Sequence, residues 1–193
     1  MIEQEEPEDS KKKDKKEKKE GAKTIGTMFR NLMSNHLQIS ALADRKAGLL
    51  VSINALIISI MTSFLVHEFA TNPRLLIPTI LLVSVCLLTI TFSLLATRPT
   101  VKPHSFESND VENSKLDLLF FGDYTQLSVE DYKLAMKKLM ANEGGLEEKM
   151  LENIYAQGTI IKKKYRLLSV AYSIFIVGFP LAVISYLIIL FIK

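Results

Sequence analysis

The feature that most constrains this chain is a run without any charged residue from Ala47 to Val66. The run is mostly apolar, and about 20 such residues are what an α-helix needs to cross the roughly 30 Å of bilayer hydrocarbon. Three charged residues stand immediately before it and are called the collar here: Asp44, Arg45 and Lys46. The run therefore predicts a membrane-spanning helix with a charged collar at its mouth.

Two further apolar blocks of comparable length occupy residues 75–96 and 167–192, each between basic residues. The chain is 48% hydrophobic and 23% charged, but nearly all of the charge lies outside the three blocks, which excludes a single soluble core. The first block starts too far from Met1 for a cleaved signal peptide, so we expect the full chain to persist. The pattern predicts an all-α membrane protein with transmembrane helices at 47–66, 75–96 and 167–192 and a small cytoplasmic helical layer.

The positions of Lys and Arg predict the orientation, because cytoplasmic flanks retain positive charge during insertion. Eight basic residues fall on one side of a three-span arrangement: Arg45, Lys46, Arg98, Lys102, Lys162, Lys163, Lys164 and Arg166. The other side receives Arg74 and Lys193. We expect the N-terminus and residues 97–166 in the cytoplasm and the C-terminus outside.

The segment before the first span divides into two parts. Residues 1–23 hold as many acidic as basic residues and almost nothing apolar, which predicts a disordered tail with at most transient helix; its basic half is also suited to anionic lipid headgroups. Residues 24–46 place Met28, Leu32 and Ile39 at helical spacing, which predicts an amphipathic helix that continues into the first span. Its apolar stripe needs a partner, either the later cytoplasmic helices or the headgroup layer.

The cytoplasmic insertion at 97–166 contains three readable pieces. The apolar run from Leu116 to Gly122 fits a short strand and a single helical turn equally well. Ser128 followed by Asp131 resembles a capping box and predicts a helix that Gly144 and Gly145 end. A second helix begins near Leu146 and continues into the third span; its apolar residues are Met150, Leu151, Ile154, Tyr155 and Ile161.

No pattern in the sequence indicates catalysis. His36, His67 and His104 are far apart, and the sequence has no metal-binding, nucleophile-elbow or phosphate-loop motif. Cys86 lies inside a predicted span and behaves as a small apolar residue. We therefore expect no enzyme, metal or bound cofactor, and the net charge of +3 gives no support to a nucleic-acid partner.

Four polar residues lie in the first span: Ser52, Asn54, Ser59 and Thr62. They either line a pore or make hydrogen bonds within the helix packing.

The collar also has two interpretations. In the first, Asp44 pairs with a neighbouring cation and the basic residues meet headgroups.

In the second interpretation, basic residues near the cytoplasmic ends of the spans together bind an anion such as a nucleotide phosphate. An aromatic side chain of the insertion then stacks on the base. The candidate ligand-binding residues are Arg45, Lys46, Arg98, Lys102, Phe121 and Tyr124, with the cluster from Lys162 to Arg166 and Phe120 nearby.

Four separated stretches resemble a known family, and they occur in its order. They read HLQISALADRKAGLLVSINALIIS, ATRP, LDLLFFGDYTQLSVEDYKLAMKKLM and ENIYAQGTIIKKKYRLLSVAYSIF. This combination resembles the membrane effector family of the Pycsar antiphage system, over a domain taken as 24–193. Some relatives carry an N-terminal phosphohydrolase domain, whereas this chain has its charged tail there, so phosphohydrolase activity is not transferred.

The resemblance implies a bacterial inner-membrane effector. A partner cyclase makes cyclic CMP or cyclic UMP on phage infection, and the effector then impairs the membrane and kills the cell. A homo-oligomer is expected, in which the ligand changes helix packing at the collar. Two alternatives remain: an adaptor membrane protein whose cytoplasmic helices bind a protein partner, and a constitutive pore that needs no cyclase.

Overall fold

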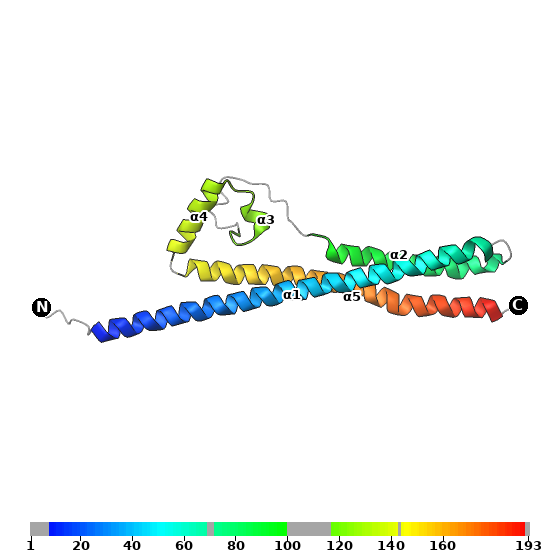
Figure 1. Cartoon of the computed structure of the whole chain (residues 1–193), viewed down its shortest axis with the longest axis horizontal. Coiled ribbons are helices and arrows are strands. Elements are labelled where there is room, and N and C mark those ends of the chain that lie inside the picture. Colours follow the sequence, from blue (N-terminus) through cyan, green and yellow to red (C-terminus); the bar gives the residue numbers. More distant parts are fainter. Residues whose placement is uncertain (1–7, 69–71, 100–116, 143, 192–193) are drawn as a thin grey trace. The chain divides into compact units, whose positions relative to one another are not determined.

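The computed structural model describes residues 8–68, 72–99, 117–142 and 144–191. Every element in these ranges is a helix (Figure 1): α1 (Glu8–Glu68), the 3-10 helix η1 (Pro73–Leu75), α2 (Leu76–Thr97), α3 (Phe121–Tyr124), α4 (Val129–Ala141) and α5 (Gly145–Phe191). Helices α1, α2 and α5 each contain a stretch long and apolar enough to cross a membrane. The prediction of an all-α membrane protein with three spanning helices is confirmed, while the limits of each span stay predictions.

Helix α1 is unbroken through the collar and the first apolar run, as expected for residues 24–66. It begins at Glu8 rather than at Thr24, which differs from the expected disordered tail; residues 1–7 lie outside the described residues. Two effects explain the early start. Oppositely charged residues three or four apart each contribute tenths of a kcal/mol to a helix, and extending an existing helix avoids the cost of nucleation.

Helix α2 ends where the sequence predicts. Its C-cap residue, Arg98, has φ −57° and ψ 128°, which is extended backbone. The ring of the following Pro99 disfavours helical geometry at the preceding residue, so the helix stops there.

Helices α4 and α5 also begin for local reasons. The Ser128 hydroxyl accepts a hydrogen bond from the Asp131 backbone N–H (3.1 Å), which satisfies one free donor of the first turn of α4. Gly144 has φ +82°, a conformation that glycine adopts without steric cost, and α5 starts at the next residue. The predicted helix from the insertion into the third span is confirmed as α5.

The chain forms two compact units, each described by itself. The helical unit comprises Met1–Leu37 and Val101–Gly158, and the membrane unit comprises Gln38–Thr100 and Thr159–Lys193. In the helical unit, only the last two residues of the apolar run that ends at Gly122 are helical, because α3 begins at Phe121. Residues 118 and 119 form a turn, and Phe120 has extended backbone. Leu116, the first residue of the run, lies outside the described residues.

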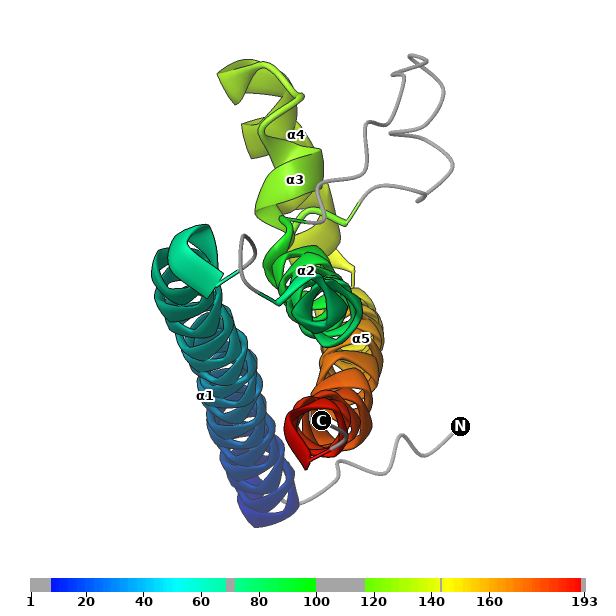
Figure 2. The same ribbon diagram turned by 90° about the vertical axis from the view of Figure 1, so that its right-hand side faces the viewer.

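The membrane unit packs α1, α2 and α5 side by side, as the view along the helices shows (Figure 2). One cluster lies near the collar and consists mainly of small residues: Ala43, Ala47, Leu50, Ala96, Leu168 and Ala171. Small side chains let helix backbones approach closely inside a bilayer, where van der Waals contact rather than the hydrophobic effect drives association. The second cluster contains Leu82, Cys86 and Ala182.

Polar side chains inside the membrane unit are mostly satisfied along their own helices. Ser52, Asn54 and Thr62 each donate to the carbonyl oxygen four residues earlier, at 2.8–3.0 Å. Between helices, the hydroxyl groups of Thr79 and Tyr186 form a hydrogen bond, and that of Tyr186 also lies 3.8 Å from the Met61 sulfur. Tyr186 thereby contacts both other helices of the unit.

Candidate functional site

The collar contains a specific ion pair between α1 and α5. The Lys164 ammonium lies 2.9 Å from each carboxylate oxygen of Asp44 and 3.0 Å from the Ser40 hydroxyl. An ammonium group has three N–H donors, and these three acceptors match them. The Lys164 side chain is 16% exposed and that of Asp44 is 43% exposed, so the pair is only partly screened by water. Lys164 is therefore engaged within the chain.

A second contact holds the same two helices together. The Tyr165 hydroxyl donates to the Ile39 carbonyl oxygen at 3.3 Å, from the residue next to Lys164. Both contacts lie beside the small-residue cluster, against which Tyr165 packs. The sequence predicts that Asp44 pairs with a neighbouring cation, and the structure identifies that cation as Lys164.

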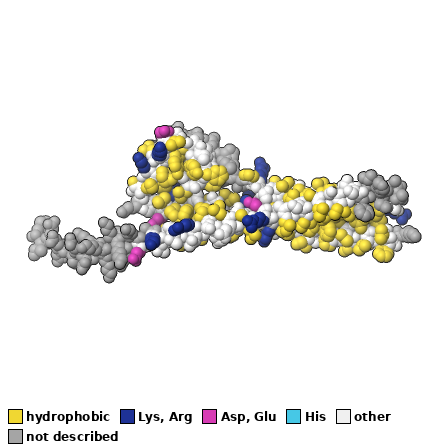
Figure 3. Space-filling model, in the orientation of Figure 1, with side chains coloured by type: hydrophobic (Ala, Val, Ile, Leu, Met, Phe, Trp, Pro, Cys, Tyr) yellow, Lys and Arg dark blue, Asp and Glu magenta, His cyan; other side chains and the backbone are white. Residues whose placement is uncertain are grey.

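Three predicted ligand-binding cations, Arg45, Lys46 and Arg98, are exposed in the membrane unit. Arg45 and Lys46 follow the buried Ala43, and Arg98 follows the buried Ala96, which packs in the same cluster. The segments that carry these cations are therefore neighbours. Lys and Arg side chains gather at one end of the apolar surface of this unit (Figure 3). Lys102 lies outside the described residues.

The aromatic candidates stand on a turn of the helical unit that Asp117 organises. One carboxylate oxygen of Asp117 accepts from the Leu119 N–H (2.9 Å), and the other accepts from the Asn153 side-chain amide (2.6 Å). The Asp117 N–H in turn donates to the Asp123 carboxylate (3.2 Å). This network ties the turn before α3 to helix α5.

Gly122 leaves room for the Phe120 ring where this turn becomes helical. A Cβ atom there would lie 2.6 Å from the Phe120 ring, closer than side chains tolerate. The ring centroids of Phe120 and Phe121 are 5.0 Å apart, within the range of favourable aromatic contact. The Phe121 side chain remains 56% exposed.

Tyr124 is half-buried and packs on Tyr132 of α4, with ring centroids 5.2 Å apart. The predicted aromatic residues are thus near neighbours on one turn of the helical unit. The predicted cations that the structure describes belong to the membrane unit. The combined site of cations and aromatic residues stays a prediction.

Asn153 is the site residue that sequence reasoning missed. It is 1% exposed, and its side-chain oxygen has no hydrogen-bond partner within the described ranges. The residues expected on the apolar face of this helix include Leu151 and Tyr155, which are 60% and 80% exposed. The only signal for Asn153 was a polar residue between apolar ones, which is also typical of a solvated position.

Across the part of the chain that the structure describes, no group of three His, Cys, Asp or Glu side chains is arranged to hold a metal ion.

Searches of curated proteins and of solved structures found no match. A family model does match the chain: it describes the Pycsar effector protein domain and covers residues 27–191. The chain belongs to the Pycsar effector family.

The matched residues of the Pycsar effector domain include the collar, all three membrane helices and the turn with Phe121. The resemblance seen in the sequence is therefore confirmed over nearly the whole of the expected domain. The Pycsar family and the three helices able to span a bilayer together make this chain a membrane protein of antiphage defence.

Proposed function

We propose that this protein is a bacterial inner-membrane effector that a cyclic pyrimidine nucleotide, cyclic CMP or cyclic UMP, activates to impair the membrane and cause abortive infection. The observation that carries the proposal is the extent of the Pycsar match, which joins the turn with Phe121, the collar and all three membrane helices in one domain. A partner cyclase supplies the nucleotide, and the effector performs no catalysis and needs no cofactor.

The chemistry of the candidate residues suits such a ligand. The cyclic phosphate carries one negative charge, which the guanidinium groups of Arg45 and Arg98 and the ammonium groups of Lys46 and Lys102 are able to bind. A pyrimidine ring has a flat face, and exposed Phe121 offers a matching surface beside Tyr124. Bases stack on aromatic side chains with little sequence selectivity, so the choice of nucleotide depends on further polar contacts.

Activation requires that the ligand bind two helix packings unequally, since a ligand with equal affinity for both shifts neither. The collar is the element that we propose to change. An anion bound at Arg45 and Lys46 repels the Asp44 carboxylate and attracts the Lys164 ammonium, so it competes with their pairing. Loss of this ion pair removes one of the contacts that hold α1 against α5 at the membrane boundary. The acting form is a homo-oligomer, in which several copies together alter the bilayer.

The direct test is isothermal titration calorimetry of the purified full-length chain with cyclic CMP and cyclic UMP, with cyclic AMP as the purine control. Dye release from liposomes containing the protein is measured in parallel. Binding of one pyrimidine nucleotide and release that depends on it support the proposal. No heat and no thermal shift would favour the adaptor alternative, and release without nucleotide would favour a constitutive pore.

Variants then locate the site. Arg45→Ala and Arg98→Ala are expected to weaken binding by about tenfold or more, because each removes a charge-assisted contact worth roughly 1.5–3 kcal/mol. Arg74→Ala is the matched control, since Arg74 lies before α2, at its other end from Arg98. Phe121→Ala, which removes a side chain that is 56% exposed, is compared with Tyr155→Ala, an 80% exposed aromatic residue of α5. Normal binding and release by both arginine variants would refute the role of the collar.

A further inference from the structure

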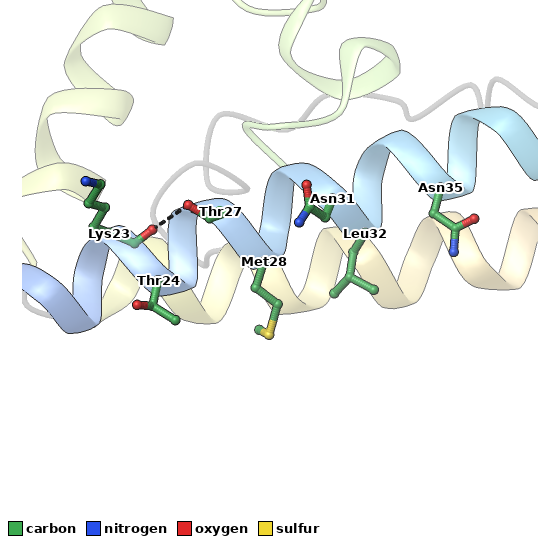
Figure 4. A pocket seen from close by; sticks show the side chains of 7 residues that line it. All are labelled: Lys23, Thr24, Thr27, Met28, Asn31, Leu32 and Asn35. Atoms are coloured by element: carbon green, nitrogen blue, oxygen red, sulfur yellow. Dashed lines mark hydrogen bonds between the residues drawn. The ribbon is translucent and has the colours of Figure 1, made fainter.

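A hollow on α1 lacks the groups that a nucleotide needs. It is lined by residues of that helix between Lys23 and Asn35 (Figure 4). Among the described residues that line it, Lys23 is the single charged one and none is aromatic. The Thr24 and Thr27 hydroxyl groups donate to carbonyl oxygens of their own helix at 2.9 Å. The turn with Phe121 is therefore the part of the helical unit that suits such a ligand.

The turn with Phe121 is closed on itself. The Asp117 backbone N–H donates to the Asp123 carboxylate at 3.2 Å, and Phe121 lies in the loop between these two residues. The Asp117 carboxylate accepts from the Leu119 N–H at 2.9 Å, which fixes the side chain relative to the backbone of the same loop. A group that binds on Phe121 and displaces this loop therefore displaces Asp117 as well.

Asn153 of α5 holds this loop through Asp117. Its side-chain amide donates to the Asp117 carboxylate at 2.6 Å, and Asn153 is 1% exposed. A hydrogen bond to a carboxylate is stronger than one between neutral groups, and burial keeps water from replacing it. The bond therefore links the loop to α5, and it is called the Asn153 joint here.

The Asn153 joint leaves one polar atom unsatisfied. A carboxylate only accepts hydrogen bonds, so the amide nitrogen of Asn153 faces Asp117 and the amide oxygen faces away. That oxygen is buried and has no hydrogen-bond partner within the ranges that the structure describes. A buried acceptor without a donor costs free energy that an apolar side chain of the same shape avoids. Packing alone therefore does not account for an asparagine here, and a displaced loop that offers this oxygen a donor is a competing arrangement.

Helix α5 extends from the Asn153 joint to the collar. It is unbroken from Gly145 to Phe191. Lys164 lies about three turns beyond Asn153, which places both residues on the same face of the helix, roughly 16 Å apart along its axis. The Lys164 ammonium donates to Asp44 and to Ser40 at 2.9–3.0 Å. A helix shift of about 1–2 Å, as in other switching proteins, is enough to weaken hydrogen bonds of this length.

We propose that the Asn153 joint couples the loop with Phe121 to α5, so that a ligand on Phe121 moves α5 and opens the pair between Asp44 and Lys164. Asn153 is a positioning residue, since it contacts Asp117 rather than the ligand. The ligand drives this change because it binds the displaced loop more tightly than the resting one. The inference rests on the proposed function, since it names how binding at the turn reaches the collar.

Asn153→Leu in the full-length chain removes the joint and keeps a side chain of similar size. Its affinity for cyclic CMP and cyclic UMP, measured by isothermal titration calorimetry, is expected to equal or exceed that of the parent protein, because binding no longer has to move α5. Nucleotide-induced dye release from liposomes should fall by about tenfold, within the usual range of allosteric coupling. Ser128→Ala is the matched control, since it removes the cap of α4 in the same unit and should leave release unchanged.

Exchanging the two side chains of the joint gives a rescue. Asn153→Asp alone sets two carboxylates against each other, so it should lose release as Asn153→Leu does. Asp117→Asn combined with Asn153→Asp again pairs one amide donor with one carboxylate and keeps an acceptor for the Leu119 N–H. The double variant is therefore expected to regain most of the dye release of the parent protein.

The outcomes distinguish the joint from the proposed function. If the parent protein shows no nucleotide-dependent release, the proposed function fails and the inference fails with it. If the parent protein responds and Asn153→Leu releases dye normally, the joint alone is refuted. Equal losses of affinity and release in Asn153→Leu would show that Asn153 merely holds the binding surface, and a double variant no better than Asn153→Asp would also overturn the coupling.

Discussion

At the scale of single residues, the pair between Asp44 and Lys164 gives a direct prediction. Asp44→Asn removes the charge that partners a Lys164 side chain only 16% exposed. We expect the free energy of unfolding in detergent to fall by about 1 kcal/mol, near the upper end for partly exposed ion pairs. The loss should shrink at high salt, because ions screen the charges. Thermal unfolding at low and high ionic strength measures both effects.

A double-mutant cycle isolates this pair. Lys164→Met is combined with Asp44→Asn, and Lys163→Met serves as the control because Lys163 is exposed. If the pair contributes, the double variant loses less stability than the sum of the two single variants. Strict additivity would contradict the predicted coupling.

At the scale of helices, α5 approaches α2 closely at Gly178. A Cβ atom at this position would lie 2.6 Å and 2.7 Å from the two γ-carbons of Val85. Because the branched Val85 side chain cannot move away by rotating a flexible end, Gly178→Ala is expected to destabilise the membrane unit by about 1–3 kcal/mol. Unfolding in detergent with increasing SDS measures the loss.

Gly48→Ala provides a matched comparison on α1. A Cβ atom at Gly48 meets nothing within 4 Å, so this substitution should be neutral or stabilise the helix by up to about 1 kcal/mol. Val85→Ala in the Gly178→Ala background should restore part of the stability. Equal effects of the two glycine substitutions would show that helix propensity, rather than the contact with Val85, determines the change in stability.

Most of the elements were predictable because their signals are local. Ser128 caps α4, Gly144 ends the turn before α5, and the residue before Pro99 leaves the helix, as their positions in the sequence indicate. The burial of Asn153 and the pairing of Asp44 with Lys164 depend on contacts between residues far apart in sequence. Periodicity predicts which face of a helix is apolar but not which distant side chain approaches it.

At the scale of the whole molecule, a labelling experiment tests the predicted membrane topology. In a Cys86→Ser background, Ser10→Cys should be cytoplasmic and Lys193→Cys should lie outside, because the basic flanks favour retention on the cytoplasmic side. A membrane-impermeant maleimide added to spheroplasts is expected to label Lys193→Cys and to label Ser10→Cys only after lysis. Labelling of both, or of Ser10→Cys alone, in intact spheroplasts would contradict the three-span orientation.

The buried polar atoms of the membrane unit bear on how water enters it. The side-chain oxygen of Asn54 and the hydroxyl of Ser93 are buried without a hydrogen-bond partner among the described residues. Each such group raises the free energy of the dry packing by roughly 1–3 kcal/mol, and 1.4 kcal/mol is a tenfold change in population. A hydrated arrangement recovers this free energy, since water satisfies both atoms. The interior of the bundle is thus biased toward wetting once the helices separate by the width of a water molecule.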